Sequence, residues 1–405
     1  MYLKHLALIN FRNYTRLELD LQARIHLLQG ENAQGKTNLL EAIYYLATTK
    51  SPLTDSDKEL INWLAEEEII PYARVEGTYV RADQEHVLEF SLVKERQPGA
   101  SSDEPRLRRQ IRLDGALRRA MDVVGQLNIV LFLPADIALV SGAPGERRRY
   151  LDITLCQLDP AYCRSLAQYN RVIVQRNALL RQIREGRAGP AELDYWDEQL
   201  TQTGAYVLMR RFWAVRELNK QVERIQPSLT GGKETLVLTY HDSVLGRFSD
   251  AKANGAKLLR TAVLSETPDE PYLADRLRRA LQIARREEVM RGVSVVGPHR
   301  DDVRFLVNNV DMTPYGSRGQ QRTTALALKL GEVALMQEQT GEMPILLLDD
   351  VISELDPHRV AFLLQTVSQA QQVFITTTDL RLYPEPFVRA AACWRVAAGA
   401  ISPLE

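Results

Sequence analysis

The stretch Gly30-Glu-Asn-Ala-Gln-Gly35-Lys36-Thr37 decides the fold, because it matches the phosphate-loop pattern G-x-x-x-x-G-K-[ST]. The apolar run Ile25-His-Leu-Leu28 precedes it and predicts a strand, while apolar residues at helical spacing from Leu39 to Leu46 follow it and predict a helix. Glycines let such a loop curl until successive backbone N–H groups face a phosphate at the positive end of the helix dipole. The alternative is an ordinary glycine-rich turn before a helix.

Each position of this loop has an expected role. Lys36 places a positive charge on the β and γ phosphates, and the Thr37 hydroxyl is a ligand for Mg²⁺. We expect nucleotide contacts from Gly30, Glu31, Asn32, Ala33, Gln34, Gly35, Lys36, Thr37 and Asn38.

A second candidate segment is Ile345-Leu-Leu-Leu-Asp349-Asp350, a buried strand that ends in two carboxylates. Mg²⁺ prefers hard oxygen ligands, so Asp349 is expected to hold the metal and Asp350 to orient the attacking water. By itself, an apolar strand followed by two aspartates is more often the N-cap of the next helix. The phosphate loop earlier in the chain favours the catalytic interpretation.

The order of the expected elements indicates an α/β head interrupted by a helical lobe. Paired strands are expected at 73–80 and 87–93, an exposed loop at 96–109, and an Asp114-Gly115 hairpin turn. Long helices follow at 160–185 and 190–226, which Gly186, Gly189, Pro190, Pro227 and Gly231-Gly232 delimit, and another helix at 272–291. Strands are expected at 293–296, 303–307, 345–348 and 373–376, with helices at 319–338 and after Pro357. Short apolar strands between helices predict a parallel sheet covered on both faces.

The domain boundaries follow from this order. We expect residues 1–150 to form the N-terminal part of the head, 151–291 the helical lobe and 292–405 the C-terminal part of the head.

The composition narrows the classes of function. The 405 residues carry a formal charge of −1, so any nucleic-acid site must be a local patch. Three cysteines, Cys156, Cys163 and Cys393, have no metal-ligand spacing and fit a reducing compartment. The start of the chain lacks the features of a signal peptide, and no apolar run approaches the roughly 20 residues that span a bilayer. We therefore expect a soluble, cytoplasmic protein with no membrane partner.

The segment Tyr315-Gly-Ser317-Arg318-Gly319-Gln320 resembles the signature motif of ABC-type ATPases. Alone it would be a serine N-cap before a helix. Its position before the acidic strand favours the signature, and so does Ser353-Glu-Leu-Asp356 after that strand, which resembles the D-loop. Thr377 lies where this superfamily usually has a switch histidine.

The chain as a whole is similar to the RecF family, a branch of the SMC-like ABC ATPases. The resemblance rests on the Ser-Arg-Gly-Gln signature, Leu-Asp-Asp at 348–350 and Thr-Thr-Thr at 376–378. It also rests on three further blocks, Asn10-Phe-Arg-Asn-Tyr14, Leu133-Pro-Ala-Asp136 with residues 142–152, and Gly297-Pro-His-Arg-Asp-Asp302.

This resemblance implies a specific mode of action. ATP and Mg²⁺ would be bound by a two-fold homodimer in which Ser317, Arg318, Gly319 and Gln320 of one subunit meet the nucleotide of the other, because phosphate loop and signature lie on different faces of such a head. Hydrolysis would release the dimer. We expect this hydrolysis to be slow, since Asp350 is one methylene shorter than the usual glutamate. It further implies binding of single- and double-stranded DNA at gaps or junctions, a nucleoid-associated role in recombinational repair, and RecR and RecO as partners.

Arginines gather at several places in the sequence, and arginine suits phosphate recognition. The candidate DNA contacts are Arg106, Arg108, Arg109, Arg147, Arg148 and Arg149, with Arg118 and Arg119 nearby. Such clusters are more often solvated faces, and Arg147 to Arg149 could equally brace the joint between head and helical lobe.

Four other classes of protein fit less well. A transporter ATPase would normally carry a switch histidine and Leu-Ser-Gly-Gly-Gln, and a small-molecule kinase has no use for a Ser317 helix start. A DNA-cutting relative would need a further acidic metal cluster. An SMC-type head would carry heptads over hundreds of residues, whereas glycine and proline stop each expected helix here after about 40 to 55 Å.

Overall fold

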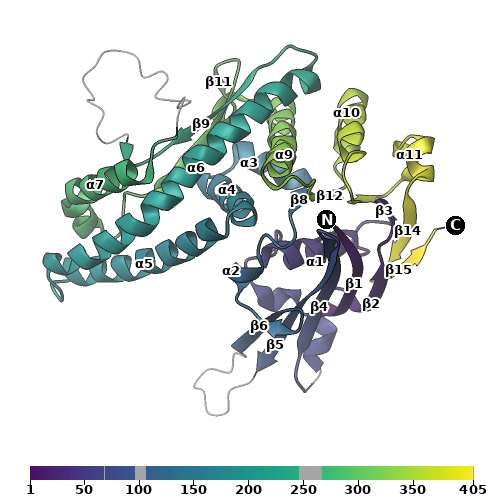
Figure 1. The fold of residues 1–405 in the computed structure, drawn as a ribbon, viewed down its shortest axis with the longest axis horizontal. Coiled ribbons are helices and arrows are strands. Elements are labelled where there is room, and N and C mark those ends of the chain that lie inside the picture. The colour runs from purple at the N-terminus through teal and green to yellow at the C-terminus, as the bar shows by residue number, and fades with distance from the viewer. Residues whose placement is uncertain (68, 96–105, 246–266, 405) are drawn as a thin grey trace. The chain divides into compact units, whose positions relative to one another are not determined.

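The computed structural model describes residues 1–67, 69–95, 106–245 and 267–404 (Figure 1). The chain divides into two compact units, of which unit 1 is Met1–Ala135 with Met336–Glu405 and unit 2 is Asp136–Leu335. These divisions differ from the expected boundaries at 150/151 and 291/292. The segment 144–158 belongs to unit 2 because it forms a helix that packs on the long helix beginning at Pro160.

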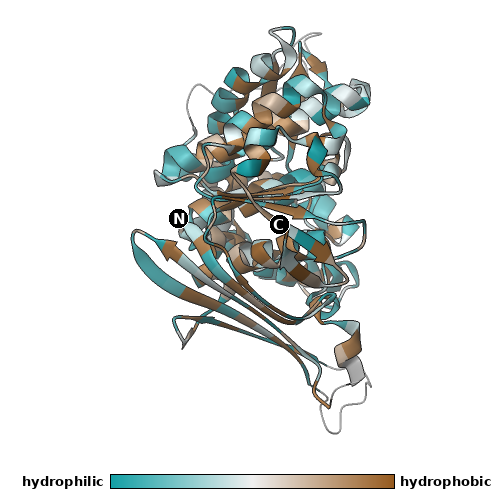
Figure 2. Ribbon diagram, turned by 90° about the vertical axis from the view of Figure 1, so that its right-hand side faces the viewer, coloured by the Kyte–Doolittle hydropathy of each residue, from teal (hydrophilic) through white to brown (hydrophobic). Residues whose placement is uncertain are grey.

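Unit 1 contains a sheet with the strand order β2-β1-β4-β5-β6-β7, in which all neighbours are antiparallel. Its strands are β1 (Tyr2–Phe11), β2 (Tyr14–Asp20), β4 (Tyr72–Arg81), β5 (Gln84–Glu95), β6 (Arg106–Leu113) and β7 (Ala116–Leu117). Alternate residues are buried along β1, β4 and β5, so one face of the sheet is apolar and the other polar, as the alternating colours in Figure 2 show. The expected Asp114-Gly115 turn is confirmed, with φ angles of 51° and 77°.

The prediction of an exposed loop at 96–109 is wrong for the last four of these residues. Arg106 to Arg109 open strand β6, which pairs with β5 from Arg106 opposite Glu95 onward. Arg106 faces Glu95 across the strands and Arg108 forms an ion pair with the same carboxylate at 3.0 Å, and such cross-strand pairs stabilise a strand that lacks apolar alternation. Residues 96–105 lie outside the described part of the chain.

The second sheet of unit 1 has the order β15-β14-β3-β13-β12-β8. It contains β3 (Ile25–Gln29), β8 (Ile129–Phe132), β12 (Ile345–Asp349), β13 (Val373–Thr377), β14 (Ala392–Ala397) and β15 (Ala400–Pro403), and only β15 is antiparallel to its neighbour. Every residue of β12 and β13 is buried, which confirms the predicted parallel sheet covered on both faces.

The helices of unit 1 are α1 (Lys36–Thr48), α2 (Ala120–Val123), α10 (Pro357–Val367), α11 (Glu385–Arg389) and the end of α9 (Arg318–Thr340). Helix α1 contacts β4 and β5 of the antiparallel sheet and β8, β12 and β13 of the parallel sheet. It is almost wholly buried as a result, and Thr37 in its first turn bonds to Asp349, the last residue of β12.

His26 in β3 makes the stability of unit 1 depend on pH. Its ring stacks on Phe374 at a centroid distance of 4.7 Å, and Trp394 Nε1 donates to its Nδ1 at 3.2 Å. Burial lowers the pKa of His26 from 6.5 to about 4, although a contact with the Ala23 backbone acts in the other direction. The folded state therefore keeps the ring neutral while the unfolded chain takes up a proton below pH 6.5, so this contribution is complete above pH 6.5 and is lost as the pH falls toward 4.

We predict that His26 accounts for about 2 kcal/mol of the stability that the protein loses between pH 7 and pH 5. Urea unfolding of the parent and of His26→Phe, which keeps an aromatic ring in the stack, measures this difference. The same loss of stability in both proteins between these pH values would contradict the assignment.

Unit 2 is mostly helical, with α3 (Ile137–Ser141), α4 (Pro144–Leu158), α5 (Pro160–Arg184), α6 (Leu193–Thr230), α7 (Glu270–Arg291), α8 (Met312–Tyr315) and most of α9. Helices α5 and α6 pack against each other, and α7 packs on both, as Figure 1 shows. Helix α6 passes through Pro227, where we expected it to end, and stops at Gly231 with φ 63°. Pro227 lies in the last turn, so it removes a single helical N–H bond there.

No long coiled coil is present in the described parts of the chain, since their longest helix, α6, has 38 residues and spans about 57 Å. Among the same residues, none of the helices is both long enough and apolar enough to cross a bilayer.

A three-stranded sheet, β11-β10-β9, completes unit 2, with β9 (Leu236–His241), β10 (Asp302–Val307) and β11 (Val310–Asp311). The prediction of a strand at 293–296 is wrong, because these residues do not form a strand. Side chains replace strand partners there, because Ser294 N donates to Asn177 Oδ1 and Val295 N donates to Glu288 Oε1, both at 2.8 Å.

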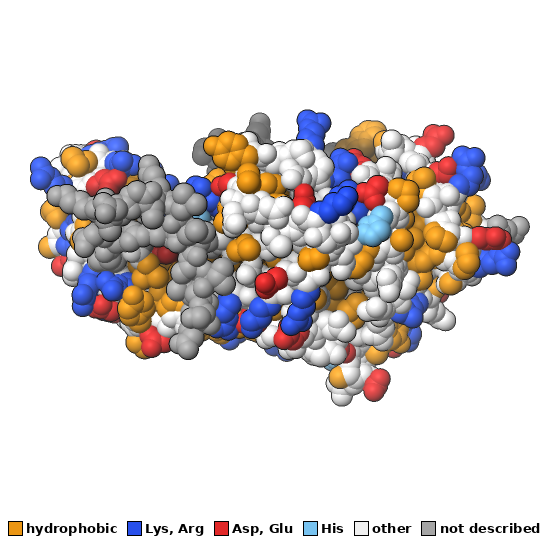
Figure 3. All heavy atoms as spheres, turned by 90° about the horizontal axis from the view of Figure 1, so that it is seen from above, with side chains coloured by type: hydrophobic (Ala, Val, Ile, Leu, Met, Phe, Trp, Pro, Cys, Tyr) orange, Lys and Arg blue, Asp and Glu red, His pale blue; other side chains and the backbone are white. Residues whose placement is uncertain are grey.

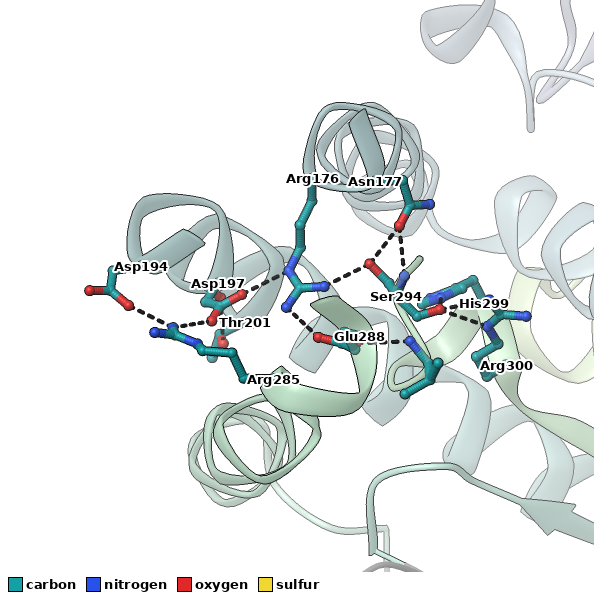
Figure 4. A network of polar contacts seen from close by, with 11 residues as sticks. Arg176, Asn177, Asp194, Asp197, Thr201, Arg285, Glu288, Ser294, His299 and Arg300 are labelled. Carbon is teal, nitrogen blue, oxygen red and sulfur yellow. Dashed lines mark hydrogen bonds and ion pairs between the residues drawn. The ribbon is translucent and has the colours of Figure 1, made fainter. Parts of the chain in front are cut away.

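A buried ion network links the three long helices of unit 2 (Figure 4). The Arg176 guanidinium on α5 donates to Asp197 on α6 at 2.7 Å, to Glu288 on α7 at 2.6 Å and to Ser294 at 2.7 Å. Arg176 and Glu288 are both fully buried. We call these four residues the Arg176 network.

Candidate nucleotide site

The loop from Gly30 to Gly35 joins β3 to α1, as its sequence predicts. Its conformation depends on glycine at both ends. A Cβ atom on Gly30 would lie 2.3 Å from the carbonyl oxygen of Val396, and one on Gly35, whose φ is 115°, would lie 2.6 Å from Asn13 Nδ2. Neither approach leaves room for a side chain.

Two turns that lie far from this loop in the sequence brace it, one between β1 and β2 and one between β14 and β15. Asn13 Nδ2 donates to the Gln34 carbonyl at 2.9 Å, Asn38 Nδ2 donates to Asn13 Oδ1 at 2.8 Å, and the Tyr14 hydroxyl donates to the Gly35 carbonyl at 2.9 Å. From the β14–β15 turn, Gly399 N donates to the Gln34 carbonyl at 3.1 Å. The loop is thereby fixed before any ligand binds, which lowers the entropic cost of holding a phosphate.

Lys36, the residue predicted to contact the phosphates, is the first residue of α1. Its ammonium donates to the carbonyl oxygens of Gly30 at 2.6 Å and Glu31 at 2.8 Å. Burial lowers the pKa of Lys36 below its ordinary value, and the carboxylates of Asp350 and Asp349 act in the opposite direction. The charge of Lys36 therefore lies within the loop and near both acidic residues.

The structure brings together the two residues predicted to hold Mg²⁺. Thr37 Oγ1 donates to the carboxylate of Asp349, with distances of 3.0 and 2.9 Å to its two oxygens, and Thr376 Oγ1 donates to Asp349 Oδ1 at 2.8 Å. A hydroxyl and a carboxylate side by side fit Mg²⁺, which takes few protein ligands and completes its shell with phosphate and water.

Asp350, Ser353 and Thr377 surround the same end of the sheet. Asp350 has a φ of 48°, its backbone N–H donates to Thr376 Oγ1 at 2.9 Å, and its carbonyl accepts from Ser353 Oγ at 2.7 Å. The carbonyl of Thr377 accepts from Gly30 N at 3.2 Å, so the position of the expected switch residue contacts the start of the phosphate loop. Asp356 caps α10 by accepting from Arg359 N at 3.1 Å.

The predicted signature segment begins α9 and belongs to unit 2. Ser317 and Gln320 cap the helix reciprocally, because Gln320 N donates to Ser317 Oγ at 3.3 Å and Ser317 N donates to Gln320 Oε1 at 3.2 Å. Ser317, Arg318 and Gly319 are exposed, and a Cβ atom on Gly319 would meet nothing within 4 Å. The segment is therefore accessible at the surface of its unit.

The arginines proposed for DNA differ in their surroundings. Arg106, Arg108 and Arg109 are all exposed on β6. Arg108 pairs with Glu95 at 3.0 Å, and Arg109 donates to Asp57 at 3.2 Å and to the Thr49 carbonyl at 3.1 Å. In the view of Figure 3, cationic and anionic side chains are interspersed.

In unit 2, Arg147 is buried and binds both carboxylate oxygens of Asp302, at 2.6 and 3.0 Å. Arg148 donates to the Asp301 carbonyl at 2.8 Å. These contacts join residues 142–152 to residues 297–302 within unit 2, so the expected brace between head and helical lobe stays a prediction. Arg149, the third of this run, is half-buried.

Sequence reasoning did not assign roles to Asn13, Tyr14, Thr376 and the turn at Ala398-Gly399. Asn13 and Tyr14 belong to a block that contributed only to the family resemblance. Thr376 precedes the expected switch position by one residue, and Gly399 has the positive φ of 74° that a turn favours. The pairing of β13 and β14 with β3 brings Thr376 and the Ala398-Gly399 turn to the loop.

Comparison with known families agrees with this geometry. The model of the RecF/RecN/SMC N-terminal domain family matches residues 2–390. The chain is 44% identical over 409 residues to the DNA replication and repair protein RecF of Chloroflexus aurantiacus, covering 99% of both chains. It belongs to the RecF family.

Other RecF relatives are similar over their whole length. The protein of Roseiflexus castenholzii is 42% identical over 100% of both chains, and that of Bacillus subtilis is 37% identical over 99% of this chain and 100% of its own. The solved structure of a recombination mediator protein RecF with ATP has a TM-score of 0.83 and 31% identity, over 100% of this chain and 98% of its own. An SMC head bound to the C-terminal winged-helix domain of ScpA, with a TM-score of 0.50 and 16% identity, shares the fold. The ABC-type ATPase fold expected from the sequence is thus confirmed.

Proposed function

We propose that this chain binds and slowly hydrolyses ATP with Mg²⁺, dimerises around the nucleotide and holds DNA as a recombination mediator in repair and replication. The observation that carries this proposal is the contact between Thr37 and Asp349, because it unites the phosphate loop with the acidic strand in one site. The names of the relatives, DNA replication and repair protein and recombination mediator in the RecFOR pathway, support the biological role and RecR and RecO as partners.

The expected chemistry follows from the groups present. Bound Mg²⁺ would neutralise phosphate charge, with Thr37 and Asp349 as its protein ligands. Lys36 attracts the phosphates, and Asp350 orients the water that attacks the γ-phosphorus. The exposed Ser317 helix start would contact the γ-phosphate held by a second copy, as anions bind at helix N-termini. Loss of the γ-phosphate after hydrolysis would then release the dimer.

A transporter ATPase remains the less favoured alternative. Thr377 replaces the usual switch histidine, and the signature reads Ser-Arg-Gly-Gln.

Asp350→Asn is expected to lower the rate of ATP hydrolysis about 10²- to 10⁴-fold, because the amide is a poor acceptor for the proton of the attacking water. ATP binding requires the phosphate loop and remains, so the dimer that ATP induces becomes longer-lived and more populated. Phosphate release and sedimentation with ATP measure the two effects. Glu385→Gln on α11, which removes an exposed pair with Arg389, serves as the control. An unchanged hydrolysis rate in Asp350→Asn would exclude the assigned role.

DNA binding is expected to depend on ATP through dimerisation. Two copies contact twice as many phosphates as one, and each phosphate contributes about −0.9 to the slope of log affinity against log salt. We therefore predict that the salt slope roughly doubles when ATP is added. Fluorescence anisotropy with gapped DNA, at several salt concentrations with and without ATP, measures both slopes. Equal slopes would argue against the coupling.

Within this scheme, the candidate phosphate contacts are the exposed arginines of β6, namely Arg106, Arg108 and Arg109. Replacing Arg106 and Arg108 with glutamine should make the salt slope shallower, whereas Arg147→Gln should chiefly destabilise unit 2.

A further inference from the structure

Glu234, between α6 and β9, connects the long helix of unit 2 to the signature segment. Its Oε1 accepts a hydrogen bond from Gln320 Nε2 at 3.1 Å, and its Oε2 accepts one from Gln226 Nε2, also at 3.1 Å. Gln226 is fully buried in the last turns of α6, and Gln320 lies in the first turn of α9. One carboxylate therefore joins the end of α6 to the start of α9.

The bond to Glu234 determines which way the Gln320 amide is turned. With Nε2 directed to the carboxylate, Oε1 is the atom that accepts the Ser317 backbone N–H at 3.2 Å. The reverse orientation would place an oxygen against the Glu234 carboxylate and an NH₂ group against the Ser317 N–H, which are two repulsive contacts. Glu234 thus stabilises the reciprocal cap that holds Ser317 at the helix start.

Close packing supports the same connection further along both helices. Gly331 of α9 lies against α6, where a Cβ atom would come within 3.1 Å of Val222 Cγ1. Helix α6 also packs on α5 and α7, the helices that the Arg176 network joins to it. A shift of α6 would therefore reach the signature segment through both Gly331 and Glu234.

We propose that Glu234 is a positioning residue that holds Ser317 in the form that meets the nucleotide of a second copy, and that it links this interface to α6. The inference rests on the proposed function, since it requires Ser317 to take part in the ATP-dependent dimer. It adds a residue outside the signature motif and gives the helical unit a direct influence on dimerisation.

The test compares Glu234→Ala and Glu234→Gln in sedimentation with ATP. A hydrogen bond to a charged group corresponds to about a tenfold effect, so the two symmetric interfaces of the dimer predict about a hundredfold weaker dimerisation for Glu234→Ala. Glu234→Gln keeps the size of the side chain but loses one of the two acceptors, so a smaller loss in the same direction is expected. Binding of a fluorescent ATP analogue at protein concentrations below dimerisation should be unchanged, because the phosphate loop is intact.

A second readout distinguishes positioning from a general structural role. Hydrogen exchange at residues 316–322 should accelerate in Glu234→Ala, while residues 236–241 of β9 exchange as in the parent. Glu198→Ala, which removes an exposed pair with Arg278, is the matched control and should change neither measurement.

Ser317→Arg separates the two proposals. If Ser317→Arg abolishes the dimer while both Glu234 variants dimerise within twofold of the parent, Glu234 has no positioning role and the proposed function stands. If Ser317→Arg also leaves the dimer unchanged, the proposed function itself is wrong. Faster exchange throughout β9 and α6 in Glu234→Ala would likewise overturn the inference, since it would show a loss of general stability.

Discussion

Lys36→Met is expected to weaken ATP binding at least about a hundredfold and to remove the ATP-dependent dimer. The ammonium lies within the phosphate loop, bonded to the carbonyl oxygens of Gly30 and Glu31. Each charge-assisted hydrogen bond to a phosphate contributes about 1.5–3 kcal/mol, and Lys36 can reach two phosphates, so the loss amounts to roughly 3 kcal/mol or more. Methionine keeps most of the apolar stem, so the packing of α1 changes little.

Isothermal titration with ATP and sedimentation with and without ATP measure these effects. Lys4→Met on β1 is the matched control, because it removes an exposed lysine that pairs with Glu85 in the same unit. Thermal unfolding of both variants checks that the fold is retained. An ATP-dependent dimer as abundant in Lys36→Met as in the parent would refute the proposed site.

Arg176→Met should destabilise unit 2 by about 3–5 kcal/mol, a fall of roughly 10 °C in its Tm. The substitution leaves the fully buried Glu288 carboxylate and the Asp197 carboxylate without the guanidinium that both of them bind. Removing one partner of a buried ion pair costs more than the pair itself contributes, because the remaining charge stays desolvated. Hydrogen exchange should accelerate in α5, α6 and α7, the helices that the network joins.

Two further variants make this result specific. Arg278→Met removes an exposed pair with Glu198 and should change stability by no more than about 0.5 kcal/mol. The double variant Arg176→Met with Glu288→Gln should recover part of the loss, because it neutralises the carboxylate left in the interior. If Arg176→Met unfolds at the same temperature as the parent, the network contributes little to stability.

The sequence predicted the elements that carry strong local patterns. The phosphate loop, the buried strand ending at Asp349 and the helices α5 and α9 lie within a few residues of their expected positions. Local chemistry fixes these elements, since turn glycines, caps and apolar periodicity act between near neighbours.

The errors occurred where distant side chains decide the backbone. Residues 293–296 were predicted to form a strand. Instead, the side chains of Asn177 and Glu288 accept hydrogen bonds from two of their backbone N–H groups, so no strand partner is needed. Residues 106–109 were predicted to form a loop, yet they pair with β5, where Arg106 faces Glu95 and Arg108 forms an ion pair with the same residue. Pro227 was predicted to end the helix, yet the cost of one lost hydrogen bond in the last turn is offset by the burial of the neighbouring Leu229 side chain.

By itself, the sequence determined the phosphate-loop fold and the RecF resemblance, and it predicted Lys36, Thr37, Asp349 and Ser317 as site residues, because their residue types and spacing carry the chemistry. Only the tertiary structure decided how Asn13 and Gly399 brace the loop, that Arg147 pairs with Asp302, and that Glu234 bonds the signature glutamine. The reason is physical. These contacts join residues that are tens to hundreds of positions apart. Strand pairing and helix packing bring them together, and neither produces a periodic pattern in the sequence that would predict the contact.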